Sequence, residues 1–249
     1  MLKNYSFVLL LIFVLSCNDN TEVDDVQKII DASIEVAGGD LYKTSNISFR
    51  FRDRDYVLEQ LKGKRALKRI QYTDSGMVTD IKQGNSFKRF INEEPIPVTD
   101  SMATVYGNSV NSVHYFALLP YGLNDRAVRK ELLGKKQIKG KDYYKVKVTF
   151  DQQGGGNDFE DVYLYWIDQK TYKPTYLAYE FHVDGGGLRF RKAYNERYVN
   201  GIRFVDYYNY KPMGEIVITQ IDSLYEKEEL VLLSKIELKN VEVNQGNYN

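Results

Sequence analysis

The chain has 249 residues, with 34 basic and 34 acidic side chains and a formal net charge of zero at pH 7. This balance excludes the clustered basic surface that nucleic-acid-binding proteins present to phosphates, so we expect no nucleic-acid partner. The 21 tyrosines and 12 phenylalanines favour half-buried strands, and the length suits one large β-rich domain.

The first residues have the pattern of a bacterial secretory signal. Lys3 precedes an uncharged apolar run from Phe7 to Leu15, and small residues follow at the expected cleavage point. A transmembrane anchor is the alternative interpretation, but it needs about 20 apolar residues, which is more than this run provides. We therefore expect the segment to be a cleaved signal peptide.

The stretch Val14–Cys17 resembles a lipobox, the pattern after which a bacterial lipoprotein is cleaved and its cysteine is lipidated. Cys17 is the one cysteine of the chain, so it has no intrachain disulfide partner. Two or three acyl chains would attach the mature protein to a membrane, because a single chain holds only marginally. The predicted organisation is a signal peptide over 1–16, a lipidated tether over 17–22 and a single domain over 23–249. The expected location is the cell envelope, anchored to the outer membrane with its periplasmic or surface orientation left open.

The first half of the chain changes from helical to strand-like spacing. Apolar residues recur at helical intervals over 22–37, where Thr21 and Asp24 resemble a capping box and Gly38-Gly39 supplies the stop. Alternating residues then predict strands, separated by turn signals, near 46–51, 55–61, 65–73, 77–83 and 86–91. The Pro-containing stretch 94–97 is expected to end this series. A broken helix is predicted over 101–119.

The second half is expected to consist of strands. The alternation predicts strands at about 129–138, 141–150, 159–168, 174–183, 187–199, 202–211, 215–225 and 229–243. Asn200-Gly201 between two alternating runs is typical of a two-residue type I′ hairpin. No linker divides the chain, which favours one domain.

Candidate metal and catalytic motifs are weak. The acidic, glycine-rich stretch 151–161 lacks the ligand spacing of a calcium loop and is better interpreted as a flexible hairpin. His114 and His182 are the two histidines, and zinc would need further ligands, so structural roles are favoured. No Gly-x-Ser-x-Gly motif is present. We predict no catalytic residue, metal or cofactor.

The stretch 162–167 is apolar or aromatic on both alternating sets of side chains. A sheet wet on one side would show polar residues at every second position. Both faces are therefore expected to be covered, either by ordinary core packing against helices or by an apolar groove for a ligand.

A family resemblance rests on several motifs. The helix ending in Gly-Gly, the run of strands and the segment 166–174, with its Asp-x-x-Thr turn and following proline, resemble the outer-membrane lipoprotein carrier and sorting-protein superfamily. The stretches 114–120, 141–148 and 190–194 more closely resemble an uncharacterised lipoprotein family of Bacteroidota. The resemblance spans nearly the whole mature chain.

The resemblance implies a mainly β fold with a few helices: a strongly curved antiparallel half-barrel covered by helices, with an apolar concave face. In the carriers that face holds lipoprotein acyl chains. This chain differs because Cys17 would tether it, more like the receptor of that system. No catalytic residue can be transferred from the resemblance.

The leading hypothesis is a membrane-anchored, monomeric lipoprotein that binds an acyl chain or another apolar ligand. The alternatives are a structural or interaction lipoprotein with a filled core and, third, a hydrolase of unknown substrate. We expect the side chains of Val162, Leu164 and Trp166 to face inward beneath the 101–119 helix. The predicted ligand-binding residues are Leu164, Trp166, Leu177, Tyr179, Phe181, Phe190, Tyr194 and Phe116.

Overall fold

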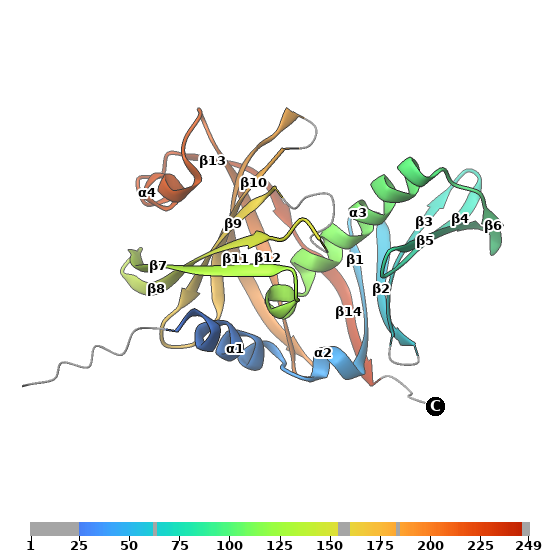
Figure 1. Cartoon of the computed structure of the whole chain (residues 1–249), viewed down its shortest axis with the longest axis horizontal. Helices are drawn as coiled ribbons and strands as arrows, with labels where there is room; N and C mark the ends of the chain where they lie inside the picture. Colours follow the sequence, from blue (N-terminus) through green and yellow to red (C-terminus); the bar gives the residue numbers. More distant parts are fainter. Residues whose placement is uncertain (1–24, 62–63, 154–159, 183–184, 246–249) are drawn as a thin grey trace, which may run out of the picture.

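A computed structural model describes residues 25–61, 64–153, 160–182 and 185–245. Their strands form two seven-stranded antiparallel sheets, which diverge from a common junction with helices between them (Figure 1). The predicted signal peptide, Cys17 and the tether lie outside the described residues.

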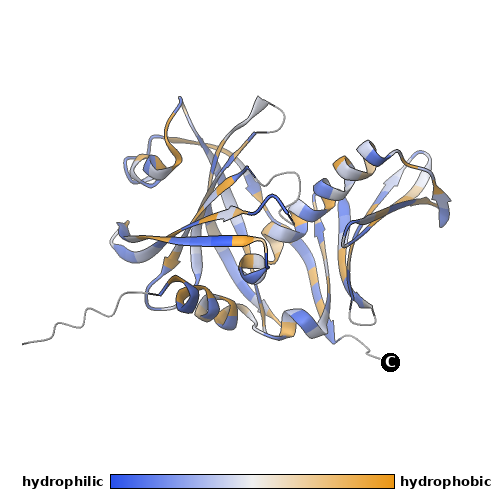
Figure 2. Ribbon diagram, viewed as in Figure 1, coloured by the Kyte–Doolittle hydropathy of each residue, from blue (hydrophilic) through white to orange (hydrophobic). Residues whose placement is uncertain are grey.

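The first sheet contains the N-terminal strands and the last strand of the chain. Its order is β14 (Leu238–Gln245), β1 (Ser45–Phe51), β2 (Arg54–Leu61), β3 (Lys64–Thr73), β4 (Gly76–Gln83), β5 (Ser86–Ile91) and β6 (Glu94–Ile96). Ser45 lies opposite Gln245, so this sheet joins distant parts of the sequence. Hydrophobic and hydrophilic residues alternate along its strands (Figure 2), as the sequence predicts for a sheet with one buried face.

The second sheet is formed by strands from the C-terminal half. Its order is β13 (Leu230–Ile236), β12 (Ile202–Pro212), β11 (Gly187–Val199), β10 (Pro174–Phe181), β9 (Val162–Asp168), β8 (Lys141–Phe150) and β7 (Val128–Ile138). The predicted turn between β11 and β12 is confirmed, because Asn200 and Gly201 both have positive φ angles, of 44° and 85°.

The two sheets are joined by what is nearly one continuous strand. Glu237 alone separates β13, which pairs with β12, from β14, which pairs with β1. At the far ends β6 pairs with β5 and β7 pairs with β8, so the sheets do not close into a barrel. The predicted mainly β, helix-covered antiparallel half-barrel is confirmed.

Helix α1 (Val26–Ala37) buries Ile29 and Ile30 on its apolar side. The side chain of Asp25 caps its first turn by accepting from the backbone N–H of Gln27, and Gly38 ends it with φ of 141°. The helix therefore begins later than the predicted 22–37, and the proposed capping box lies outside the described residues. The short helix α2 (Leu41–Thr44) leads into β1.

Helix α3 (Asp100–Ala117) crosses from the first sheet toward the second (Figure 1). It is continuous, so the predicted break is wrong. Gly107 is buried where the helix approaches Lys82 and Phe87, so this glycine allows close packing rather than interrupting the helix. A cis Leu119–Pro120 bond and the 3₁₀ helix η1 (Tyr121–Asn124) follow.

Two other predicted segments differ in the structure. The stretch 215–225 is not a strand but contains the 3₁₀ helix η3 (Ile218–Gln220) and helix α4 (Ile221–Glu226). The series expected to end at 94–97 gains the short edge strand β6, where Pro95 is tolerated because an edge strand leaves some N–H positions unpaired. No helix among the described residues combines the length and apolarity needed to cross a bilayer.

Candidate ligand-binding face

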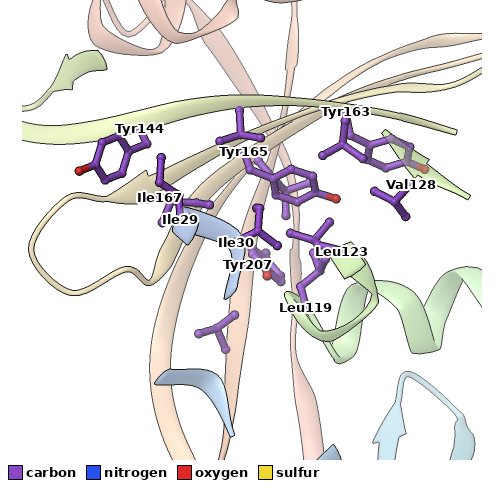
Figure 3. Close-up of a cluster of buried hydrophobic side chains, with 14 residues drawn as sticks. Ile29, Ile30, Leu119, Leu123, Val128, Tyr144, Tyr163, Tyr165, Ile167 and Tyr207 are labelled. Atoms are coloured by element: carbon purple, nitrogen blue, oxygen red, sulfur yellow. The ribbon is translucent and has the colours of Figure 1, made fainter. Parts of the chain in front are cut away.

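The second sheet has two buried faces, which strand β9 defines. Tyr163, Tyr165 and Ile167 point toward α1 and the segment after α3 (Figure 3), and we call this side the inner face. Leu164 and Trp166 alternate with them and point toward η3 and α4, and we call this side the outer face. Both faces are covered, as the aromatic composition of β9 predicts.

The predicted inward orientation of Val162, Leu164 and Trp166 is wrong. A β-bulge in the neighbouring strand β10 decides which of its residues lie beside them. Pro174 pairs with Ile167, but Tyr176 pairs with Trp166, so Thr175 is an extra residue in β10. Without this residue, Leu177 would lie opposite Leu164. With it, every later side chain of β10 changes face, and Leu177 lies opposite Tyr165.

The eight predicted ligand-binding residues are consequently divided between the two faces. Phe116, Leu177 and Tyr179 belong to the inner cluster, and Phe181 follows Tyr179 on the same side of β10. The outer face holds the other four: Leu164, Trp166 and Phe190 in its cluster, and Tyr194, whose ring stacks on Tyr208.

The outer face around Trp166 is packed core. Ile218, Ile221 and Tyr225 cover it, and the Trp166 and Leu164 side chains are fully buried. The indole Nε1–H donates to Oδ2 of Asp222 over 3.2 Å, and the Lys145 ammonium contacts the same carboxylate oxygen at 2.7 Å. The one polar group of the indole is therefore hydrogen-bonded within the fold.

The inner face is a continuous aromatic surface covered by helix α1 and by the segment that follows α3. Ile29 and Ile30 of α1 contact it from below, while Leu119 and Leu123 cover it after α3 (Figure 3). The Tyr115 and Tyr165 hydroxyl oxygens are 2.6 Å apart, which joins α3 to β9. Burial raises the pKa of both phenols, so both remain neutral hydrogen-bonding groups.

A cavity of about 170 Å³ lies where α3, η1 and both sheets meet. β3 contributes Arg65 and Leu67, and the second sheet contributes Val128 and Phe150. The remaining wall comes from α3 and the segment after it: Asn111, His114, Tyr115, Leu118, Tyr121, Gly122, Asp125 and Ala127. The cavity thus lies between the sheets, at one end of the inner aromatic surface.

His114 supplies a buried polar group to this cavity. Its Nε2 lies 3.1 Å from the Lys68 carbonyl oxygen, and because a carbonyl accepts, Nε2 carries the hydrogen. Nδ1 is then an acceptor, and it has no hydrogen-bond partner in the structure. Burial lowers the pKa of His114 to about 4, so the imidazole is neutral at pH 7.

Arg65 and Asp125 make the cavity wall partly polar. The Arg65 guanidinium lies 5.5 Å from the centre of the Tyr121 ring. Burial raises the pKa of Asp125, and the nearby Arg65 charge opposes that rise. A ligand in this cavity would meet at least as much polar as apolar surface, so the wall is more polar than that of the usual small-molecule site.

Sequence reasoning did not select Tyr115, Tyr163, Tyr165 or Phe150 as site residues. The alternation along β9 already separates Tyr163 and Tyr165 from Trp166, so it provides the two sets without saying which is inner. The cavity residues of β3 carry no local signal, because they approach the second sheet only through the tertiary fold.

The described residues place no hydroxyl nucleophile beside either histidine. Among the described hydrogen bonds, neither His114 nor His182 contacts a hydroxyl group. Nδ1 of the exposed His182 is 3.5 Å from the carboxylate of the buried Asp161. No group of three or more His, Cys, Asp or Glu residues in the described part of the chain is placed to hold a metal ion.

The fold, with two unclosed antiparallel sheets around helices, is similar to that of a solved LolA superfamily protein. A LolA superfamily protein from Nitrosomonas europaea superposes with a TM-score of 0.51 and 14% identity, covering 88% of this chain and 94% of that protein. The chain belongs to the family of unknown function DUF6503, whose sequence model matches residues 3–238.

Two further solved structures show weaker similarity. A domain assigned to outer membrane lipoprotein sorting in Vibrio parahaemolyticus has a TM-score of 0.34 and 9% identity, with 90% of this chain and 95% of that chain covered. The lipoprotein LppX of Mycobacterium tuberculosis has a TM-score of 0.28 and 13% identity over 65% of this chain and 91% of that chain. A search of curated proteins found no match.

Proposed function

We propose that this protein is a lipoprotein of the cell envelope, anchored through Cys17, that binds an acyl chain or another apolar ligand on its inner face. The observation that carries the proposal is the cavity between the sheets, whose lining residues Tyr115 and Phe150 contact Tyr163 on the aromatic surface of β9. Burying methylene groups contributes about 0.8 kcal/mol each, so a long acyl chain could bind without extensive polar recognition.

A long acyl chain requires more space than the cavity offers. Its volume of about 170 Å³ is below the roughly 300–1,000 Å³ of typical ligand pockets. Helix α3 is fixed to the first sheet by polar contacts, such as the 2.8 Å hydrogen bond from Arg69 to Ser109. Toward the second sheet it packs mainly through aromatic rings, including those of Tyr115 and Phe116. We therefore expect the ligand to enter by separating Phe116 from the inner face.

The anchor explains why the protein would act at a membrane. Acyl chains on Cys17 would hold the domain beside a bilayer, and the tether over 17–22 is short. The outer membrane is the location that the resemblance to lipoprotein-sorting proteins favours. The protein would then receive or present its ligand at that surface.

The small size of the cavity favours a second candidate function. A structural or interaction lipoprotein needs no ligand space, and the side chains around Trp166 on the outer face are buried core. In that case the cavity of about 170 Å³ would hold water, which polar groups such as His114 and Arg65 could bind.

A reporter at the cavity separates the two functions. Phe150→Trp places an indole in the cavity wall, and the unmodified protein supplies the signal of Trp166 on the opposite face. Titration with palmitic acid should shift the emission of the variant and leave that of the unmodified protein unchanged. An unchanged variant, together with native mass spectra showing no co-purified lipid, would favour the structural function.

A further inference from the structure

Three arginines are buried in the described part of the chain, and one of them has no carboxylate partner. Arg69 is 4% exposed and contacts Asp80 at 2.6 Å, and Arg203 is also 4% exposed and contacts Glu196 at 2.6 Å. Arg191 is 8% exposed and makes no ion pair with any described residue. A buried, unpaired charge is costly, which makes Arg191 an exception that needs an explanation.

Arg191 lies on the inner face, opposite Leu177. Its Nη2–H donates to the Tyr179 hydroxyl over 2.8 Å, and the centre of the guanidinium lies 4.0 Å from the Phe116 ring centroid. Its Nε–H is buried and has no hydrogen-bond partner among the described residues. The aromatic contacts offset part of the desolvation cost, but they do not neutralise the charge or satisfy the remaining donor.

Aromatic contacts connect Arg191 to the cavity. The Phe116 ring centroid lies 6.2 Å from that of Tyr163, and the Tyr163 centroid lies 5.6 Å from that of Phe150. Phe150 lines the cavity. The inner face therefore has an apolar surface with a cavity at one end and an unpaired cation at the other.

We infer that Arg191 binds the anionic head group, a carboxylate or phosphate, of a lipid whose acyl chain lies along Tyr163 into the cavity. This inference rests on the proposed function and specifies its ligand class. The planar guanidinium suits such a group, because its N–H donors match the spacing of two anionic oxygens. The lipid would supply the missing counter-charge, and Phe116 would cover the contact.

The test uses the mature lipidated chain in phosphatidylcholine nanodiscs. Two photoreactive probes with the same hydrocarbon chain are compared. One is a palmitic acid analogue, and the other is the corresponding alcohol, which lacks the charge. The acid should label the protein about tenfold to a hundredfold more than the alcohol, and the labelled peptides should contain Phe150 or Tyr163. Arg191→Gln should reduce labelling by the acid to the level of the alcohol.

Arg189→Gln is the matched control, because Arg189 lies two residues away on the same strand and contacts the Phe181 ring at 5.0 Å. It should keep the preference for the acid. An equal preference in Arg191→Gln and the unmodified protein would overturn the inference, as would equal labelling of the unmodified protein by both probes. No labelling by either probe would instead refute the proposed function.

Competition distinguishes a lipid head group from a free anion. Inorganic phosphate and acetate lack an acyl chain, so at millimolar concentrations they should leave labelling by the acid unchanged. If phosphate or acetate abolished the preference for the acid over the alcohol, Arg191 would be a site for free anions. That result would overturn the lipid assignment. This competition experiment uses only the unmodified protein, so its result does not depend on the stability of a variant.

Discussion

The backbone N–H of Leu238 donates to Oδ1 of Asp206 over 2.9 Å at the point where the chain passes from the second sheet to the first. The Leu238 carbonyl oxygen accepts from Nη2 of Arg197 over 2.6 Å. Asp206 also contacts Nη1 of Arg197, at 3.2 Å, and accepts from Asn195 over 2.6 Å. Both main-chain polar groups of Leu238 are thus paired with side chains of the second sheet, which fixes the bend between β13 and β14.

Asp206→Ala should therefore destabilise the protein strongly. Its carboxylate is buried, and its loss leaves the Leu238 N–H without its side-chain acceptor and the Arg197 guanidinium without its carboxylate partner. We expect a loss of about 3 kcal/mol in the free energy of unfolding, measured by urea denaturation. Asp55→Ala, which removes the more exposed Arg50–Asp55 pair, should cost at most about 1 kcal/mol. Similar losses for both variants would contradict the role assigned to the bend.

The buried His114 should make the protein less stable in acid. Its pKa is about 4 in the folded protein and 6.5 as an ordinary value, so the unfolded state binds its proton first as the pH falls. The stability that neutral His114 provides is complete above pH 6.5 and is lost progressively toward pH 4. This loss amounts to about 3 kcal/mol.

His114→Gln tests this dependence, because its amide can still donate to the Lys68 carbonyl. Between pH 7 and pH 4 the unmodified protein should lose about 3 kcal/mol more in its free energy of unfolding than the variant loses. The other titrating groups, including Asp125, are common to both proteins and cancel in the comparison. Parallel stability curves would show that His114 does not titrate in this window.

Cys17→Ser should abolish lipid attachment. The expected result is unprocessed precursor, or a form without lipid, that no longer stays with the membrane fraction. Metabolic labelling with a palmitate analogue measures this directly. Equal incorporation in the unmodified and Cys17→Ser proteins would rule out Cys17 as the anchor.

Two buried leucines on opposite faces of the second sheet distinguish the inner from the outer surface. Leu164 is 0% and Leu177 is 1% exposed, so each truncation to alanine should cost about 2–5 kcal/mol of stability. Palmitic acid binding should weaken in folded Leu177→Ala and remain unchanged in folded Leu164→Ala. Binding by isothermal calorimetry, with circular dichroism to verify folding, provides the comparison, and equal weakening would disprove the assignment of faces.

Strand positions could be predicted from the sequence where one face is buried, because that burial imposes an alternation of period two. The segment 215–225 was misassigned although Ile218, Ile221 and Tyr225 follow helical spacing. All three contact the outer cluster in the structure. In a stretch this short, Ile216 and Ile218 also fit an alternating pattern, so the two periods cannot be distinguished.

The candidate site was predictable only in part, because register is a tertiary property. Alternation separated the Trp166 set from the Tyr165 set correctly, but the bulge at Thr175 reversed which residues of β10 accompany each set. The sequence also does not distinguish Arg191 from the other buried arginines. The lack of a carboxylate partner for Arg191 becomes visible only when the partners of Arg69 and Arg203 are known.

The pairing of β1 with β14 sets an order of events for folding during synthesis. β14, which completes the edge of the first sheet, follows every other strand of that sheet in the chain, so β1 has an unpaired edge until Leu238–Gln245 has been synthesised. An unpaired edge can recruit strands of other chains. A polypeptide stalled before this point would therefore be prone to aggregation, and the first sheet should be completed only after β14 is available to pair with β1.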